Sequence, residues 1–306
     1  MAITNFTGDE QQQTVEPLSC SPGLTAGLPD HLTFISVFNS FLSLTAFLGN
    51  ALILTALHKE SSLHPPSKLL LRCLATTDLC VGLLSEPLFV TVWMLMVNEH
   101  WNMCVYVDAV GFRIAFILTG VSLWTLTAIS VDRLLALLLG LRYKQVVTLK
   151  RTFVIVITFW VVQTAFSAVL FWNSLITLCY AITGVSLCLV TSIFSYTKIL
   201  LKLRHHQNQQ PNQENQLNME QYKKVLSTAI WLQLTLVACY LPSGITLALI
   251  AKSGLSLSIY QTWNYVLTLV FLNSSLNPIL YCWKIDEVRQ AMKNTIRQVL
   301  CHCFSS

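Results

Sequence analysis

Apolar residues along this chain fall into seven long segments separated by shorter polar stretches. Each segment has about 20 residues or more, the length that an α-helix needs to cross a hydrocarbon layer of roughly 30 Å. The segments lie near residues 32–57, 69–97, 103–135, 153–173, 176–201, 224–251 and 256–283. The pattern predicts an all-α integral membrane protein, a bundle of seven transmembrane helices.

The composition agrees with a membrane protein. Apolar residues make up 54% of the 306 residues and charged residues only 11%, and the mean hydropathy is +0.60. Such values lie outside the range of soluble globular domains. We expect an extracellular N-terminal segment at 1–31, the helical domain at 32–283, and a cytoplasmic tail at 284–306. The tail starts with KIDEVRQAMKNTIRQVL, whose apolar spacing predicts a short amphipathic helix on the inner membrane surface.

The distribution of Lys and Arg predicts the orientation. Fourteen of them lie in the connections after the first, third, fifth and seventh segments, whereas Lys252 alone lies on the opposite side. Basic residues in short loops stay on the cytoplasmic side, so the N-terminus is expected outside a plasma membrane. The net charge of +5 is then an orientation signal, and no nucleic-acid partner is needed to explain it. Asn5 begins a glycosylation sequon on the predicted outer side.

Two adjacent ionisable residues, Asp132 and Arg133, interrupt the apolar stretch LTAISVDRLLALLLGLRY. A charged side chain inside a membrane segment costs roughly 2.5–3.5 kcal/mol on insertion scales. A chain that keeps two such residues side by side is expected to use them, so this pair is the first functional candidate.

Several polar residues also occur deep inside the predicted helices. They are Asn50, Asp78, Ser122, Asn273, Ser274 and Asn277. Each could simply form one interhelical hydrogen bond. However, Asn273, Ser274 and Asn277 lie on one face of an ideal helix and can converge on the Asp78 carboxylate. A carboxylate surrounded by hydroxyl and amide oxygens in a dry interior favours a small cation or a proton.

Prolines interrupt the last two segments near the middle of the membrane. Pro242 stands in CYLPSG and Pro278 in NPILY. Each proline removes a backbone hydrogen bond and favours a kink. Two kinked helices beside a buried charge predict an element with two conformations.

The ordered set of motifs resembles the rhodopsin-like G-protein-coupled receptors. The set comprises GN in the first helix, LATTD in the second, SVDRL closing the third, Trp160 in the fourth, CYLP in the sixth and NPILY in the seventh. The resemblance covers residues 32 to about 299. It implies a receptor that binds an extracellular ligand and activates a heterotrimeric G protein by changing shape.

The resemblance also implies roles for single residues. Arg133 would receive the G protein, with Asp132 restraining it at rest. Tyr196 and Tyr281 would swing toward Arg133 on activation, and Tyr240 would stand where the family usually has a switch tryptophan. A sodium pocket would be formed by Asp78, Ser122, Asn273, Ser274 and Asn277. Cys301 and Cys303 would be palmitoylated beside the amphipathic helix.

Departures from the family pattern bear on the ligand. Ala115 stands where monoamine receptors have an amine-binding aspartate, and Asp108 stands where the family has its disulfide cysteine. The very short connection between helices 4 and 5 looks most like melanocortin, lysophospholipid, cannabinoid and adenosine receptors. Asn277 does not favour the melanocortin group, which has Asp there. Leu134, Gly140 and Cys188 also replace usual family residues.

Cys104 lies one turn outside Asp108 and could form a disulfide with Cys20 or with Cys179, or remain free. The sequence alone does not rank these partners.

The outer ends of helices 2 and 3 predict the ligand pocket. Glu86 and Asp108 would stand above a floor of Phe116, Tyr240, Leu247 and Trp263. Two carboxylates there suit a cationic ligand such as a basic peptide, and the melanocortin resemblance implies a bridging calcium ion. If both carboxylates are instead solvated rim charges, the floor suits an apolar lipid or an adenosine-like ligand.

Other function classes have less support. A transporter or channel is the main alternative, but paired half-sequences with broken helices are not visible. We expect no enzyme, because HExxH and GxSxG motifs are missing from the sequence.

Overall fold

The computed structural model describes residues 20–22, 29–59, 63–169, 172–209, 216–254, 256–284, 289, 290 and 297. Within these ranges the side chains of 203, 205–230, 232, 233 and 281–284 are not described. Predictions for Asn5, the Tyr281 side chain, Cys301, Cys303 and the amphipathic helix lie outside the described residues, apart from single positions of that helix.

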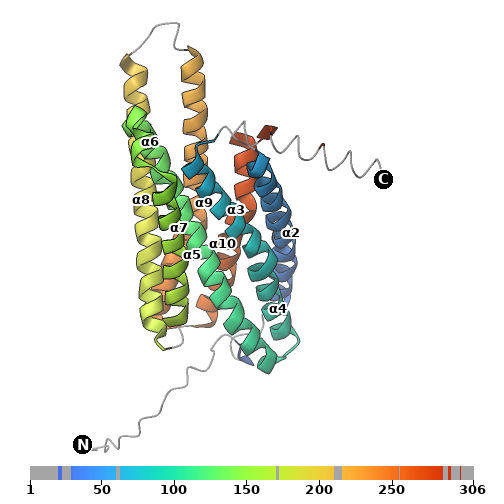
Figure 1. The fold of residues 1–306 in the computed structure, drawn as a ribbon. Helices are drawn as coiled ribbons and strands as arrows, with labels where there is room; N and C mark the ends of the chain where they lie inside the picture. The colour runs from blue at the N-terminus through green and yellow to red at the C-terminus, as the bar shows by residue number, and fades with distance from the viewer. Residues whose placement is uncertain are drawn as a thin grey trace, which may run out of the picture.

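The described chain is helical throughout and contains no strand, so the predicted all-α bundle is confirmed (Figure 1). In chain order the elements are α2 Pro29–Lys59, α3 Pro65–Cys80, η1 Val81–Ser85, α4 Glu86–Val97, α5 Trp101–Leu139, η2 Gly140–Arg142, α6 Tyr143–Val146, α7 Leu149–Val169, α8 Ser174–Gln209, α9 Gln216–Ser253 and α10 Leu257–Lys284. The long helices run side by side, and α3, η1 and α4 together form one rod.

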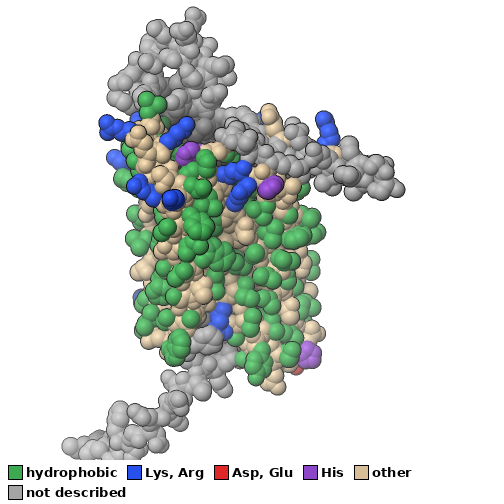
Figure 2. Space-filling model, in the orientation of Figure 1, with side chains coloured by type: hydrophobic (Ala, Val, Ile, Leu, Met, Phe, Trp, Pro, Cys, Tyr) green, Lys and Arg blue, Asp and Glu red, His purple; other side chains and the backbone are tan. Residues whose placement is uncertain are grey.

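Six of the described rods are long and apolar enough to cross a membrane. The seventh predicted segment corresponds to α10, which packs between α9 and α2. Its lower hydropathy has a physical cause, because its described part buries six polar side chains: Asn264, Thr268, Asn273, Ser274, Ser275 and Asn277. The face shown in Figure 2 is covered mostly by apolar side chains, and most of its Lys and Arg side chains lie at the α6 end.

The second rod contains a π turn that the sequence analysis did not predict. Pro87 is the second residue after η1; it has no N–H, and in a regular α-helix its ring would crowd the carbonyl of Leu83. A π turn absorbs this conflict by adding a residue to the turn, which rotates everything beyond it. Gly82, inside η1, packs so closely on α2 that an added Cβ would lie 2.8 Å from the Ser43 carbonyl oxygen.

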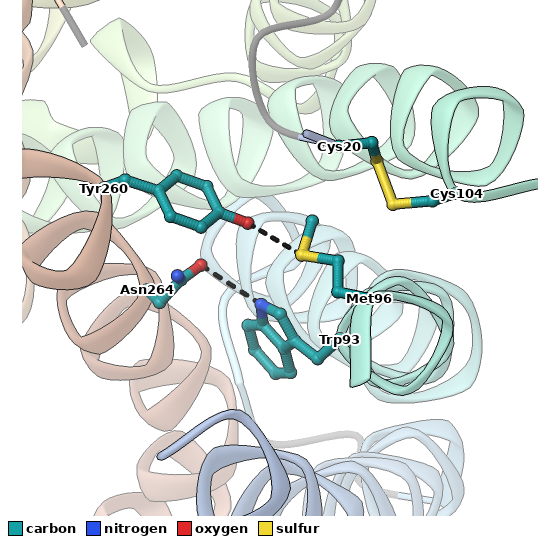
Figure 3. The surroundings of a disulfide bond; sticks show 6 residues. All are labelled: Cys20, Trp93, Met96, Cys104, Tyr260 and Asn264. Atoms are coloured by element: carbon teal, nitrogen blue, oxygen red, sulfur yellow. Dashed lines mark hydrogen bonds between the residues drawn. A yellow bond between two sulfur atoms is a disulfide. The ribbon is translucent and has the colours of Figure 1, made fainter. Parts of the chain in front are cut away.

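A disulfide joins Cys20, in the N-terminal segment, to Cys104 near the start of α5, with the Cα atoms 5.9 Å apart (Figure 3). Cys179 is exposed and free. The structure therefore selects Cys20 from the two partners that the sequence left open. The N-terminal segment is tied to the end of the bundle opposite α6.

Candidate functional site

The buried carboxylate of Asp78 lies at the centre of the bundle and is fully enclosed. Its Oδ1 accepts hydrogen bonds from Ser122 Oγ of α5 at 3.0 Å and from Ser274 Oγ of α10 at 2.9 Å. Its Oδ2 accepts a hydrogen bond from Asn277 Nδ2 at 2.7 Å. One side chain of α3 thus holds two other helices.

The remaining polar residues of this level extend the cluster. Asn277 Nδ2 also donates to Asn273 Oδ1 at 3.3 Å, and Asn50 Nδ2 of α2 donates to the Ser274 carbonyl at 3.0 Å. Beside them Pro278 packs on α2, where a Cβ on Gly49 would lie 2.9 Å from its ring. All five residues of the predicted sodium pocket are therefore brought together, with a second tie to α2.

The α6 end of the bundle carries Asp132 and Arg133. Asp132 is buried and accepts hydrogen bonds from Ser67 Oγ of α3 at 2.8 Å and from Tyr143 Oη of α6 at 2.6 Å. Within the described chain the carboxylate makes no ion pair with Arg133, so the restraint of Arg133 by Asp132 stays a prediction. The half-buried Arg133 lies near Tyr196.

Sequence reasoning missed Ser67 and Tyr143 as partners of Asp132. Tyr143 returns to α5 because the chain turns at Gly140, which has a φ of 51° that favours glycine. The ring of His64 lies 5.0 Å from the Tyr143 ring and covers it. Gly140 was the available signal, since a glycine there permits the turn.

A cavity of about 570 Å³ lies toward the disulfide end, between α4, α5, α7, α8, α9 and α10. Five of the six predicted ligand residues line it: Asp108, Phe116, Tyr240, Leu247 and Trp263. At its rim Trp93 Nε1 donates to Asn264 Oδ1 at 3.1 Å, and Tyr260 Oη donates to Met96 Sδ at 3.2 Å (Figure 3). These bonds fix α4 against α10.

Glu86 is the exception, and the prediction that it shares this cavity with Asp108 is wrong. Glu86 is fully buried outside the cavity lining, and neither carboxylate oxygen has a hydrogen-bond partner. The rotation by the π turn is the physical reason: Glu86 lies one turn beyond Gly82, on the segment that packs against α2. Asp108 is the only carboxylate among the described residues of the lining, and Glu86 does not join it there as the predicted calcium site requires.

Tyr143→Phe should destabilise the protein, because the change removes a hydrogen bond to a carboxylate, an interaction of roughly 1.5–3 kcal/mol. The apparent melting temperature in detergent measures the effect. Tyr106→Phe is the control, since Tyr106 is 73% exposed at the opposite end of α5. Equal melting temperatures for the two variants would show that the Tyr143 hydroxyl does not stabilise the α6 end.

Comparison with known proteins supports the receptor family that the sequence motifs resemble. The family model described as 7 transmembrane receptor (rhodopsin family) matches residues 49–172 and 166–281. Melanocortin receptor 5 of Mus musculus is 24% identical over 283 residues, which cover 86% of this chain and 83% of that protein. These relatives are signalling receptors rather than enzymes, and a transporter or channel is not favoured. The chain belongs to the rhodopsin family of seven-transmembrane receptors, the ligand-activated receptors that act on G proteins.

Proposed function

We propose that this receptor binds a cationic ligand beside Asp108 and activates a heterotrimeric G protein at the end that carries Arg133. The Asp78 cluster is the observation that carries the proposal. It lies beside the deep end of the cavity, where Ser122 is two residues from the lining residue Trp124, and it joins α5, which carries Arg133, to α3 and α10. A ligand that shifts α5 or α10 must therefore act on this cluster.

The receptor is proposed to lie in the plasma membrane with its N-terminus outside. Lys and Arg gather at the Arg133 end of the bundle (Figure 2), as expected of a cytoplasmic face. The Cys20–Cys104 disulfide at the opposite end fits an oxidising exterior.

The G-protein contact is assigned to Arg133. Its neighbour Asp132 is occupied by Ser67 and Tyr143, so the guanidinium can form bonds with a partner. Tyr196 lies alongside and packs with Leu134 and Ile199. Lys202 Nζ donates to the Leu137 carbonyl at 2.7 Å, which holds α8 against α5 at this level.

A sodium ion is proposed as a modulator at Asp78. The donor set fits a hard cation, because a carboxylate, the hydroxyl oxygens of Ser122 and Ser274 and the Asn273 amide oxygen meet in one buried cluster. The ion would supply a positive charge that the described cluster lacks. By holding α3, α5 and α10 together it would favour the resting conformation.

The ligand is proposed to carry a positive charge, because among the described lining residues Asp108 is the only acidic group and most of the others are aromatic or aliphatic. Phe116 and Trp263 would supply apolar and cation–π contacts. This proposal replaces the two-carboxylate site that the sequence suggested.

Arg133→Ala should abolish agonist-stimulated nucleotide exchange on the G protein while leaving surface expression and ligand binding largely intact. The reason is that Arg133 has no ion-pair partner within the described bundle, so its loss leaves no buried charge unpaired. Exchange measured in reconstituted membranes tests this. A well-expressed variant that still signals normally would remove Arg133 from the coupling mechanism.

Agonist affinity should fall as sodium rises in the wild type, and Asp78→Asn should lose this dependence, because an amide binds a cation less well than a carboxylate. N-methylglucamine chloride at the same ionic strength is the control for screening. A variant that keeps the wild-type sodium response would make the cluster purely structural.

Asp108→Asn should weaken agonist potency tenfold or more, about 1.4 kcal/mol, because it removes the only charged side chain among the described residues that line the cavity. Glu86→Gln is the matched control and should stay within twofold, since Glu86 does not line the cavity. The agonist is one identified by a ligand screen with a second-messenger readout. If Asp108→Asn also stays within twofold, an apolar lipid or an adenosine-like ligand is favoured instead.

A further inference from the structure

The cavity extends well beyond the level of the proposed cationic contact. Its lining follows α5 from Asp108 to Trp124, a distance of about 24 Å at 1.5 Å per residue. At its deep end it enters the space between α5, α7 and α8. We call this part the inner arm, lined by Gly120, Trp124, Gln163, Gly184 and Val185.

Gln163 is a buried amide without a partner in this arm. Its side chain is 3% exposed, and its Oε1 is enclosed without a hydrogen bond. Nor does its amide nitrogen bond to any described residue. An unsatisfied buried polar group costs roughly 1–3 kcal/mol, and nearly all such groups in proteins find partners. Packing of the helices therefore does not account for a glutamine at this position.

Gly120 makes room for this amide. A Cβ built on Gly120 would lie 2.6 Å from Gln163 Oε1, so only glycine lets the carboxamide rest against the α5 backbone. On the α8 wall, the Cβ of a substituted Gly184 would meet nothing closer than Trp124, at 3.9 Å. The arm is thus a slot with a fixed amide on one wall and free space beside the other.

Tyr180 supplies a second polar group near the slot, and Trp124 lies beside its hydroxyl. Its hydroxyl oxygen is enclosed without a hydrogen bond. Its ring is held in place, stacked on Phe166 at 3.7 Å between centroids and 6.2 Å from Phe116. The hydroxyl is therefore positioned by apolar contacts and can donate to a ligand.

A primary carboxamide presents one acceptor oxygen and an N–H donor side by side. A ligand group that pairs with both must place an N–H opposite the oxygen and an acceptor oxygen opposite the N–H. A carboxylate offers no donor to Gln163 Oε1, and a single hydroxyl proton satisfies only one of the two groups. Small residues on α5 and α8 beside the Trp124 ring further favour a planar group.

We propose that the inner arm binds the amide edge of a planar ligand group, an N–H beside a C=O as in a lactam or a nucleobase, paired with the Gln163 carboxamide. The proposal rests on the cavity being the ligand site of this receptor. It adds a second recognition point about 18 Å along α5 from Asp108. A ligand with a positive group at one end and an amide-bearing ring at the other fills both.

Two fragments of nearly equal shape test this pairing: 2-quinolone, a planar lactam, and its N-methyl derivative, which lacks the donor. Binding to the full-length receptor in lipid nanodiscs is measured by ligand-observed NMR. We expect the lactam to bind the wild type at least tenfold more tightly than the N-methyl derivative. Gln163→Met, which keeps the side-chain volume, should abolish this difference.

Two further variants separate the pairing from general damage to the cavity. Gly184→Leu fills the slot from α8 and should weaken the lactam while leaving Gln163 in place. Ser243 lines the same cavity, but its hydroxyl already donates to the Tyr240 carbonyl at 2.7 Å. The variant Ser243→Ala should therefore keep the lactam preference.

The proposal is overturned if the folded wild type binds neither fragment or binds both equally, or if Gln163→Met keeps the preference. Binding is read without a G protein, so such a result leaves coupling at Arg133 intact. Conversely, a failure of nucleotide exchange in the same preparations would not alter the fragment result.

Discussion

The structure depends on one buried carboxylate that must find its hydrogen-bond donors inside the bundle. A polar group within a membrane has no water to bind, so its partners come from neighbouring helices. Asp78 of α3 takes its donors from α5 and α10, and Asn50 of α2 bonds to the same turn of α10. Four rods are thereby fixed in register at one level.

Some buried polar groups in the rest of the bundle have hydrogen-bond partners and others have none. The first kind orders the helices, and the second kind leaves bonds for a ligand to form. Ser67 and Tyr143 satisfy Asp132 and order the α6 end, as the Trp93–Asn264 bond orders the opposite end. Glu86 and Gln163 remain without partners. Gln163 lines a cavity and can be completed by a ligand, whereas Glu86 lies outside that cavity and nothing in the described chain pairs with its carboxyl group.

The rods and the Asp78 cluster were predictable because apolar length and helical period are local properties. Asn273, Ser274 and Asn277 share a face on any regular helix, so their convergence followed from spacing. The prediction for Glu86 was wrong because it assumed a regular helix of 3.6 residues per turn, whereas the π turn before Pro87 changes the direction of the residues that follow it. The partners of Asp132 were missed because the turn at Gly140 sets where Tyr143 returns.

Long-range pairings were less predictable still. Nothing in the spacing of Cys20, Cys104 and Cys179 fixes which two meet, because a disulfide depends on how a loop crosses the bundle. The role of Gln163 could not be predicted from its position in an apolar helix either, because it depends on the contact with Gly120 on the facing helix.

A double-mutant cycle between Asp78→Ala and Ser274→Ala tests the central claim most directly, with agonist-stimulated nucleotide exchange as the readout. Both substitutions remove the same bond between α3 and α10, so the account predicts that their effects are strongly non-additive, with a coupling of about 1 kcal/mol or more. Effects that add to within roughly 0.5 kcal/mol would contradict the account, because the carboxylate and α10 would then act independently.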